Sequence, residues 1–128
     1  MVQSDGKRPK RVAERIRAEL MGMLLRGAVH DPEAAGAHVT EVVVTADLRL
    51  ARVYVRVIGD EPTALRQRAL IAALERARGF LRRELGATLG LRFTPDLEFF
   101  WDADVDRAAK VEGLLAEIER DRKREGDR

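Results

Sequence analysis

The chain has 128 residues and a formal net charge of +2, and 45% of its residues are hydrophobic against 36% charged. This length predicts one domain, and the 5% aromatic content predicts a core built mostly of Val, Leu, Ile and Ala. Cysteine is absent, which excludes disulfides, thiolate catalysis and zinc sites of the cysteine type. We expect a cytoplasmic protein without membrane attachment, because there is neither an apolar signal segment nor a run of about 20 apolar residues.

The first half of the chain predicts one helix followed by a β-hairpin. Residues 1–7 are polar, and we expect them to be flexible. From Pro9 onward apolar residues recur at helical spacing, and Gly27 is the expected stop. A loop rich in Pro and Gly follows. Residues 39–45 are mostly β-branched and residues 51–57 alternate between apolar and polar side chains, so both are predicted strands joined by a short turn.

The next stretch predicts two helices separated by a break. One helix begins after Asp60 or Thr63, since either side chain suits an N-cap, and it runs to about Ala77. Beyond Gly79 the helical spacing resumes, and we expect this second helix to end between Gly86 and Gly90. Ala77 and Gly79 are therefore the candidate kink residues. We expect Gly79 to adopt backbone angles that a side chain would forbid.

A third strand is predicted over residues 91–101. Its alternation places five large apolar residues on one face: Leu91, Phe93, Leu97, Phe99 and Trp101. Pro95 cannot donate to a strand ladder, so this strand should lie at the edge of the sheet or carry a bulge. Residues 105–118 carry a final short helical stripe, and the charged residues after them are expected to be solvated or disordered.

Positive charge is concentrated in two stretches of the chain. Residues 1–30 hold seven basic residues against three acidic ones, and residues 76–92 hold five against one. From residue 96 onward the balance is acidic, with 11 acidic against seven basic residues. Such asymmetry is typical of a surface that faces phosphates, although a solubilising surface is the alternative. The candidate nucleic-acid-binding residues are Lys7, Arg8, Lys10, Arg11, Arg15, Arg76, Arg78, Arg82, Arg83 and Arg92.

Other motifs point to structure rather than to chemistry. Residues 102–106 alternate Asp with other residues like the start of a calcium loop, but the glycine and glutamate that such a loop needs are missing, and helix capping explains them better. His30 and His38 lack the spacing of metal ligands. The aromatic residues 99–101 could stack on bases, yet packing is the preferred interpretation, with Phe100 pointing outward. Catalytic motifs are absent, so we expect no enzyme activity and no cofactor or metal.

The predicted order of helix, strand, strand, helix, helix and strand is the type II arrangement of the KH fold, an α+β fold with a three-stranded mixed sheet covered by helices on one face. Five stretches have a distinctive order and spacing: residues 11–16 (RVAERI), 39–44 (VTEVVV), 51–55 (ARVYV), 79–82 (GFLR) and 91–99 (LRFTPDLEF). In these stretches the chain resembles the ribosome-binding factor A family of bacterial assembly factors of the small ribosomal subunit. These stretches suggest a KH-like domain at 8–102, preceded by the flexible residues 1–7 and followed by a C-terminal helix and tail at 103–128.

The resemblance implies a function in ribosome biogenesis. A KH domain joins its paired helices by a Gly-x-x-Gly loop that clamps about four nucleotides. This sequence lacks Gly-x-x-Gly, and Ala77-Arg78-Gly79 stands at the expected place, one residue shorter, as in the interrupted helix of the family. The family likeness implies a monomer that binds 16S rRNA near its 5′ end on free, immature 30S subunits, but not 50S subunits or mature 70S ribosomes. It would assist late 30S maturation and 16S rRNA processing. The alternatives are a generic KH module for single-stranded RNA and a protein-interaction module.

Overall fold

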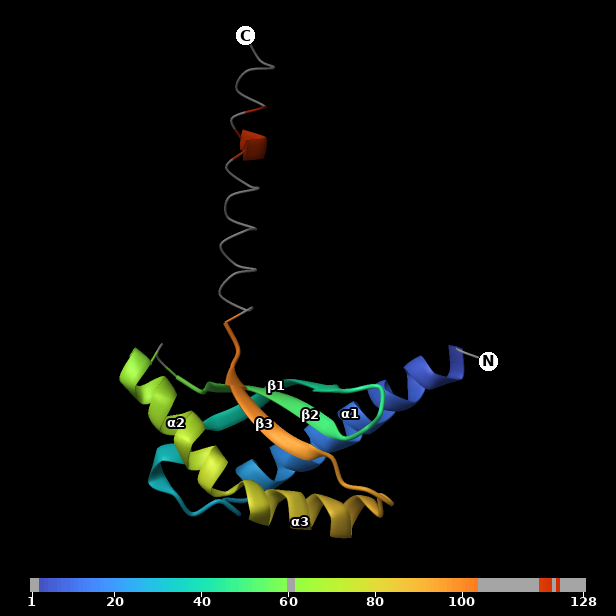
Figure 1. Ribbon diagram of the computed structural model, residues 1–128. Helices are drawn as coiled ribbons and strands as arrows, with labels where there is room; N and C mark the ends of the chain where they lie inside the picture. The colour runs from blue at the N-terminus through green and yellow to red at the C-terminus, as the bar shows by residue number, and fades with distance from the viewer. Residues whose placement is uncertain (1–2, 60–61, 104–117, 121, 123–128) are drawn as a thin grey trace.

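The computed structural model describes residues 3–59, 62–103, 118–120 and 122. The chain forms its elements in the predicted order (Figure 1): α1 (Gln3–Leu25), the short 3-10 helix η1 (Pro32–Ala34), β1 (Ala37–Val44), β2 (Leu50–Val57), α2 (Ala64–Arg76), α3 (Arg78–Leu89) and β3 (Asp96–Trp101). Apart from residues 118–120 and 122, the predicted C-terminal helix and tail lie outside the described residues. The boundary proposed for the C-terminal segment therefore stays a prediction, whereas residues 3–7, which were expected to be flexible, belong to α1.

The three strands form one mixed sheet in the order β1-β2-β3. β1 and β2 pair antiparallel from Ala37 opposite Val57 to Val44 opposite Ala51, with one irregularity in register near Thr40. β3 runs parallel to β2 and lies at the end of this order, so it is an edge strand, as predicted, although Pro95 lies just before the strand and not inside it. Helices packed against such a sheet confirm the predicted KH-like α+β class.

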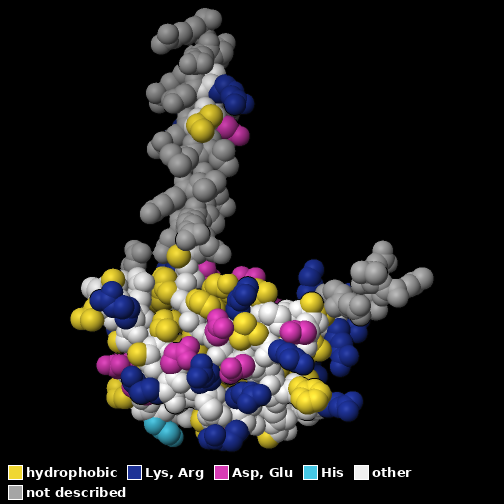
Figure 2. All heavy atoms as spheres, viewed as in Figure 1, with side chains coloured by type: hydrophobic (Ala, Val, Ile, Leu, Met, Phe, Trp, Pro, Cys, Tyr) yellow, Lys and Arg dark blue, Asp and Glu magenta, His cyan; other side chains and the backbone are white. Residues whose placement is uncertain are grey.

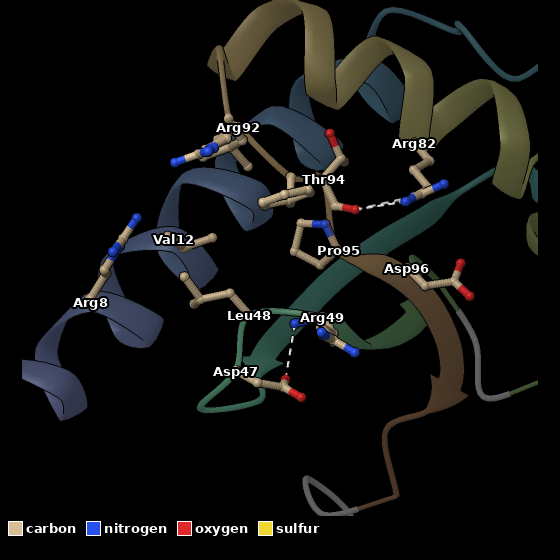
Figure 3. Close-up of a pocket in the computed structure, with 12 residues that line it drawn as sticks. Arg8, Val12, Asp47, Leu48, Arg49, Arg82, Arg92, Thr94, Pro95 and Asp96 are labelled. Carbon is tan, nitrogen blue, oxygen red and sulfur yellow. Dashed lines mark hydrogen bonds between the residues drawn. The ribbon is translucent and has the colours of Figure 1, made fainter.

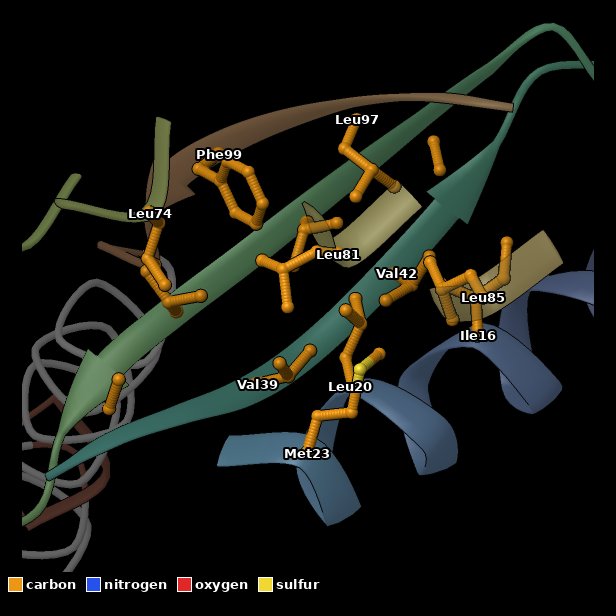
Figure 4. Close-up of a cluster of buried hydrophobic side chains, with 14 of the residues drawn as sticks. Ile16, Leu20, Met23, Val39, Val42, Leu74, Leu81, Leu85, Leu97 and Phe99 are labelled. Carbon is orange, nitrogen blue, oxygen red and sulfur yellow. The ribbon is translucent and has the colours of Figure 1, made fainter. Parts of the chain in front are cut away.

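Apolar side chains fill the space between the sheet and the helices (Figure 4). On β2 the small residues Ala51, Val53 and Val55 are buried, whereas the polar residues between them face the other side of the sheet. The helices contribute large buried side chains to the same cluster, namely Ile16, Leu20, Met23, Leu70, Leu74, Leu81 and Leu85. Leu97 and Phe99 of β3 complete it. Full burial of each such side chain stabilises the fold by roughly 1.5–3 kcal/mol.

The ends of the helices follow local sequence signals. The amide of Ala28 donates to the carbonyl of Met23 at 3.0 Å, while Gly27 has a φ of 72°, so α1 ends in a Schellman motif. The Thr63 side chain accepts from the Arg66 amide at 3.1 Å, which identifies Thr63 as the N-cap of α2. Gly90, with a φ of 61°, ends α3.

Two predicted boundaries are wrong. α1 begins at Gln3 and contains Pro9, whose fixed φ of about −65° fits a helix although its ring removes one backbone hydrogen bond. β3 begins at Asp96 rather than at residue 91, because its partner strand β2 begins only at Leu50 and offers no ladder further back. Residues 91–95 form a loop instead.

The expectation for the face of the third strand is partly wrong. Leu97 and Phe99 are buried and Trp101 is half-buried, but Phe93 is 77% exposed. Phe93 lies in the loop, where the alternation of the strand does not apply. Phe100 points away from the core, as predicted, and stacks on Tyr54 with ring centroids 5.6 Å apart.

Candidate nucleic-acid interface

The break between the paired helices lies at Ala77, which has helical backbone angles (φ −86°, ψ −3°). The expected special role of Gly79 is wrong. Gly79 lies in the first turn of α3 without a positive φ, and an added Cβ would meet only the Arg83 guanidinium, at 3.5 Å. The break between α2 and α3 therefore needs no residue with a left-handed backbone. Ala77 can occupy it because its backbone angles are right-handed.

Arg76 at the break fastens α2 to the segment around η1. Its guanidinium Nη2 lies 2.7 Å from Oδ2 of Asp31 and 3.2 Å from Oε2 of Glu33. The hydrogen bond from Arg76 holds the pKa of Asp31 below its ordinary value, and the same carboxylates raise the pKa of Arg76. Arg76 is thus a structural residue whose positive charge is neutralised by Asp31 and Glu33.

Two further predicted arginines bind backbone carbonyls. Arg82 donates through Nε and Nη2 to the carbonyl of Thr94, at 3.2 and 2.9 Å, and so ties the 91–95 loop to α3. Arg15 of α1 donates to the carbonyl of Leu89 at 2.8 Å, in the last turn of α3, where a cation complements the helix dipole. Both arginines hold elements together.

The other predicted basic residues are exposed. Arg78 pairs with Glu75 at 3.1 Å, one turn earlier in the chain. Arg83 lies on the outer side of α3. Lys7, Lys10 and Arg11 are exposed along the first half of α1. Figure 2 shows Lys and Arg side chains spread over this face of the molecule and continuing to the end at which α1 begins.

A cleft of about 710 Å³ brings together residues from three distant parts of the chain (Figure 3). α1 contributes Arg8 and Val12, the β1–β2 turn contributes residues 47–49, and α3 with the following loop contributes Arg82 and residues 91–96. The cleft therefore unites Arg8, Arg82 and Arg92 among the predicted binding residues. It also contains Arg49 and Phe93, which are not among the predicted binding residues.

Apolar side chains form the floor of the cleft. Val12 of α1 and Leu48 of the hairpin turn face each other across it (Figure 3), and Leu91 and Pro95 extend the apolar surface. Leu48 has a φ of 62°, a left-handed conformation that is uncommon for a branched residue. The turn holds it there, because the Leu48 amide donates to the carbonyl of Thr45 at 2.8 Å and the Leu48 side chain packs on the core.

The carboxylates of the cleft are occupied by backbone and hydroxyl donors. The Asp47 carboxylate accepts from the Thr45 hydroxyl at 2.6 Å and from the Arg49 amide at 3.1 Å, and these bonds lower the pKa of Asp47. Asp96 accepts from the Leu97 amide at 3.0 Å. Four arginines face these two aspartates, so the cleft is positively charged. Arg8, Arg49 and Arg92 are exposed on its rim, where a phosphate can reach them.

Other kinds of site find no support in the part of the chain that the structure describes. No group of three or more His, Asp or Glu side chains there could hold a metal ion. Asp102, the first residue of the motif that resembles a calcium loop, is buried and accepts a hydrogen bond from the Thr40 hydroxyl. No helix among the described residues has the length and apolar content to cross a membrane.

Comparisons with known proteins agree on one family. The sequence model described as ribosome-binding factor A matches residues 8–115. A ribosome-binding factor A of Desulfatibacillum aliphaticivorans is 42% identical over 111 residues, which cover 87% of this chain and 87% of that protein. The crystal structure of ribosome-binding factor A from Thermus thermophilus shares the fold, with a TM-score of 0.60 at 24% identity over 73% of this chain and 94% of that one.

A further structural relative is a homology model of Thermus thermophilus ribosome-binding factor A. That model was fitted into the cryo-EM map of a complex with the 30S subunit. Its TM-score is 0.50 at 30% identity, and the match covers 69% of this chain and 93% of that one.

Proposed function

Because the chain belongs to the ribosome-binding factor A family, we propose that it binds free, immature 30S ribosomal subunits through contacts with 16S rRNA. The observation that carries this proposal is the positively charged cleft between α1, the β1–β2 turn and the 91–95 loop. Support comes from the homologous Thermus thermophilus protein, a homology model of which was fitted into the cryo-EM map of its complex with the 30S subunit. The exposed bases of α1 extend the positive surface away from the cleft.

The proposed mechanism is conformational. Arginine side chains hold RNA by its phosphates, and phosphate contacts fix position and orientation without reading sequence. A factor that holds rRNA segments in one arrangement assists late 30S maturation and the processing of 16S rRNA near its 5′ end, while other proteins perform the cleavage. We propose that the protein acts as a monomer in the cytoplasm, without enzyme activity of its own. The protein dissociates when the rRNA of the 30S subunit reaches its mature arrangement, because that arrangement removes the rRNA surface to which the protein binds.

The test of this function is co-sedimentation of the full chain with ribosomal particles on sucrose gradients. The protein should travel with 30S subunits from cells that accumulate immature particles, and it should be absent from 50S subunits and mature 70S ribosomes. Its release should increase steeply with salt, since phosphate contacts displace counterions.

The same gradients separate the alternatives. A generic KH module would bind deproteinised RNA as well as it binds immature 30S subunits. A protein-interaction module would stay on its partner as salt rises. Equal association with mature 70S ribosomes and immature 30S subunits would contradict the proposal.

A further inference from the structure

We propose that the cleft receives one unpaired RNA base, which stacks on Phe93 while Arg8, Arg49 and Arg92 hold the flanking phosphates. This inference rests on the proposed function and deepens it, because it names single-stranded RNA as the form that this site recognises. It makes Phe93 a binding residue of a chain that has no Gly-x-x-Gly clamp.

The exposure of Phe93 is the first observation. Its side chain is 77% exposed, whereas the core buries aliphatic residues from every strand and long helix together with Phe99. Each exposed aromatic ring forgoes the stabilisation that burial gives. The Phe93 ring therefore adds little burial energy to the fold, and a polar residue at this position would stabilise the loop equally well.

The loop that presents Phe93 is anchored on both sides. Before β3, Arg82 holds the carbonyl of Thr94 with two hydrogen bonds, and Pro95 is buried. The Asp96 amide then donates to the carbonyl of Arg49 at 2.8 Å, which joins the loop to the hairpin turn. These contacts fix the backbone that follows Phe93, and a preorganised backbone lowers the entropic cost of binding.

The 91–95 loop also packs closely against α3. Gly86 lies so close to the loop that an added Cβ would stand 2.6 Å from Oγ1 of Thr94. Glycine here lets α3 and the loop approach each other without a side chain between them.

The surroundings of Phe93 suit a nucleotide. The Arg92 guanidinium carbon lies 5.8 Å from the centroid of the Phe93 ring, which places a positive charge beside the aromatic plane. A cleft of about 710 Å³ is large enough for a nucleotide, since small-molecule pockets span roughly 300–1,000 Å³. Its floor is apolar and its rim is cationic, which matches a flat base attached to a charged backbone.

The expected ligand is unpaired because stacking needs a free base face. In an A-form duplex the bases are stacked on each other, and proteins contact mainly the phosphates and 2′-hydroxyls. Stacking on an aromatic side chain tolerates any base and contributes about 1–3 kcal/mol per base, which corresponds to about five- to 150-fold in affinity. The site should therefore distinguish single strands from duplexes more than one sequence from another.

The test uses the full chain and a short single-stranded RNA in which one adenine is replaced by fluorescent 2-aminopurine, together with the same RNA in a duplex. Phe93→Ala should weaken binding of the single strand about five- to 150-fold and leave duplex binding unchanged. Phe93→Tyr should bind as the wild type does, because the ring remains. Phe80→Ala is the matched control, since Phe80 is 38% exposed on α3 and outside the cleft, and it should bind normally. Circular dichroism verifies that each variant is folded.

Three results would overturn the inference: normal single-strand binding by Phe93→Ala, equal losses for single strand and duplex, or a Phe93→Tyr defect as large as that of Phe93→Ala. Sedimentation with immature 30S subunits keeps the two proposals apart. If the wild type binds these subunits and Phe93→Ala loses no single-strand affinity, only the stacking site fails. If the wild type does not bind the subunits at all, the proposed function fails.

Discussion

Replacing the three exposed arginines of the cleft rim by glutamine should change how RNA binding depends on salt. The variant Arg8→Gln, Arg49→Gln, Arg92→Gln removes three positive charges that border the cleft. These side chains are exposed, and none of them forms an ion pair in the part of the chain that the structure describes, although the charge of Arg49 contributes to the lowered pKa of Asp47. The fold should therefore survive the substitutions.

The expected magnitude follows from counterion release. Each phosphate contact with a single strand contributes about −0.7 to the slope of log affinity against log salt, so three contacts contribute about −2.1. Between about 50 and 200 mM salt the wild type should lose about 20-fold more affinity than the triple variant does. Fluorescence anisotropy of a labelled single-stranded RNA at several KCl concentrations measures both slopes.

A matched control separates the local effect from net charge. The variant Arg17→Gln, Arg26→Gln, Arg68→Gln also removes three positive charges, from positions outside the cleft. Arg17 and Arg26 pair with Glu14 and Glu19 on α1, and Arg68 lies on α2. The control should keep the slope of the wild type. If both triple variants change the slope equally, or if the rim variant leaves it unchanged, the assignment of phosphate contacts to the cleft is wrong.

Three other substitutions test separate parts of the structure. Gly79→Ala should raise the free energy of unfolding by up to about 1 kcal/mol in urea titrations and leave RNA affinity unchanged, because alanine is the better helix former; lost affinity would mean that the glycine itself contacts RNA. The lowered pKa of Asp47 stabilises the fold at pH values above the ordinary carboxyl pKa of 3.8, and this stability is lost as pH falls through the lower folded-state pKa. The melting temperature of Asp47→Asn should therefore fall less than that of the wild type in thermal melts from pH 5 downward. Parallel curves of melting temperature against pH would contradict this. Arg82→Met removes the two hydrogen bonds to the Thr94 carbonyl and should make the 91–95 loop more mobile. In that background Phe93→Ala should therefore reduce RNA affinity less than it does in the wild type. Additive effects in this double-mutant cycle would show that Arg82 does not position the ring.

The fold could be predicted from the sequence because its signals are local and periodic. β2 alternates between buried small residues and exposed polar ones, and that alternation alone identifies a half-buried strand. Thr63 and Gly90 mark helix ends through interactions within one turn of the chain. The start of β3 could not be predicted in this way. It depends on where β2 begins, and β2 lies far away in sequence.

The cleft could be predicted only in part. Net positive charge near residues 8, 82 and 92 is visible in the sequence, but the meeting of α1, the hairpin turn and the loop is a tertiary event. Arg49 was missed because one basic residue after a turn has no distinctive pattern. Phe93 was missed because its neighbours alternate like a strand, and only the loop conformation turns its ring outward.

The arginines around the helix break show why composition alone cannot assign function. Arg76 and Arg82 lie six residues apart, yet Arg76 binds carboxylates of the η1 segment and Arg82 binds a carbonyl of the loop. Reversing both to glutamate would place like charges beside Asp31 and remove the support of the cleft, so lost 30S association in such a variant would report unfolding as much as binding. Arg83 and Arg92 make no such structural bond among the described residues. The structure thus divides one cluster of positive charge into cations that hold the fold together and exposed cations that are the candidates for RNA contact, and only the second group gives substitutions that test binding alone.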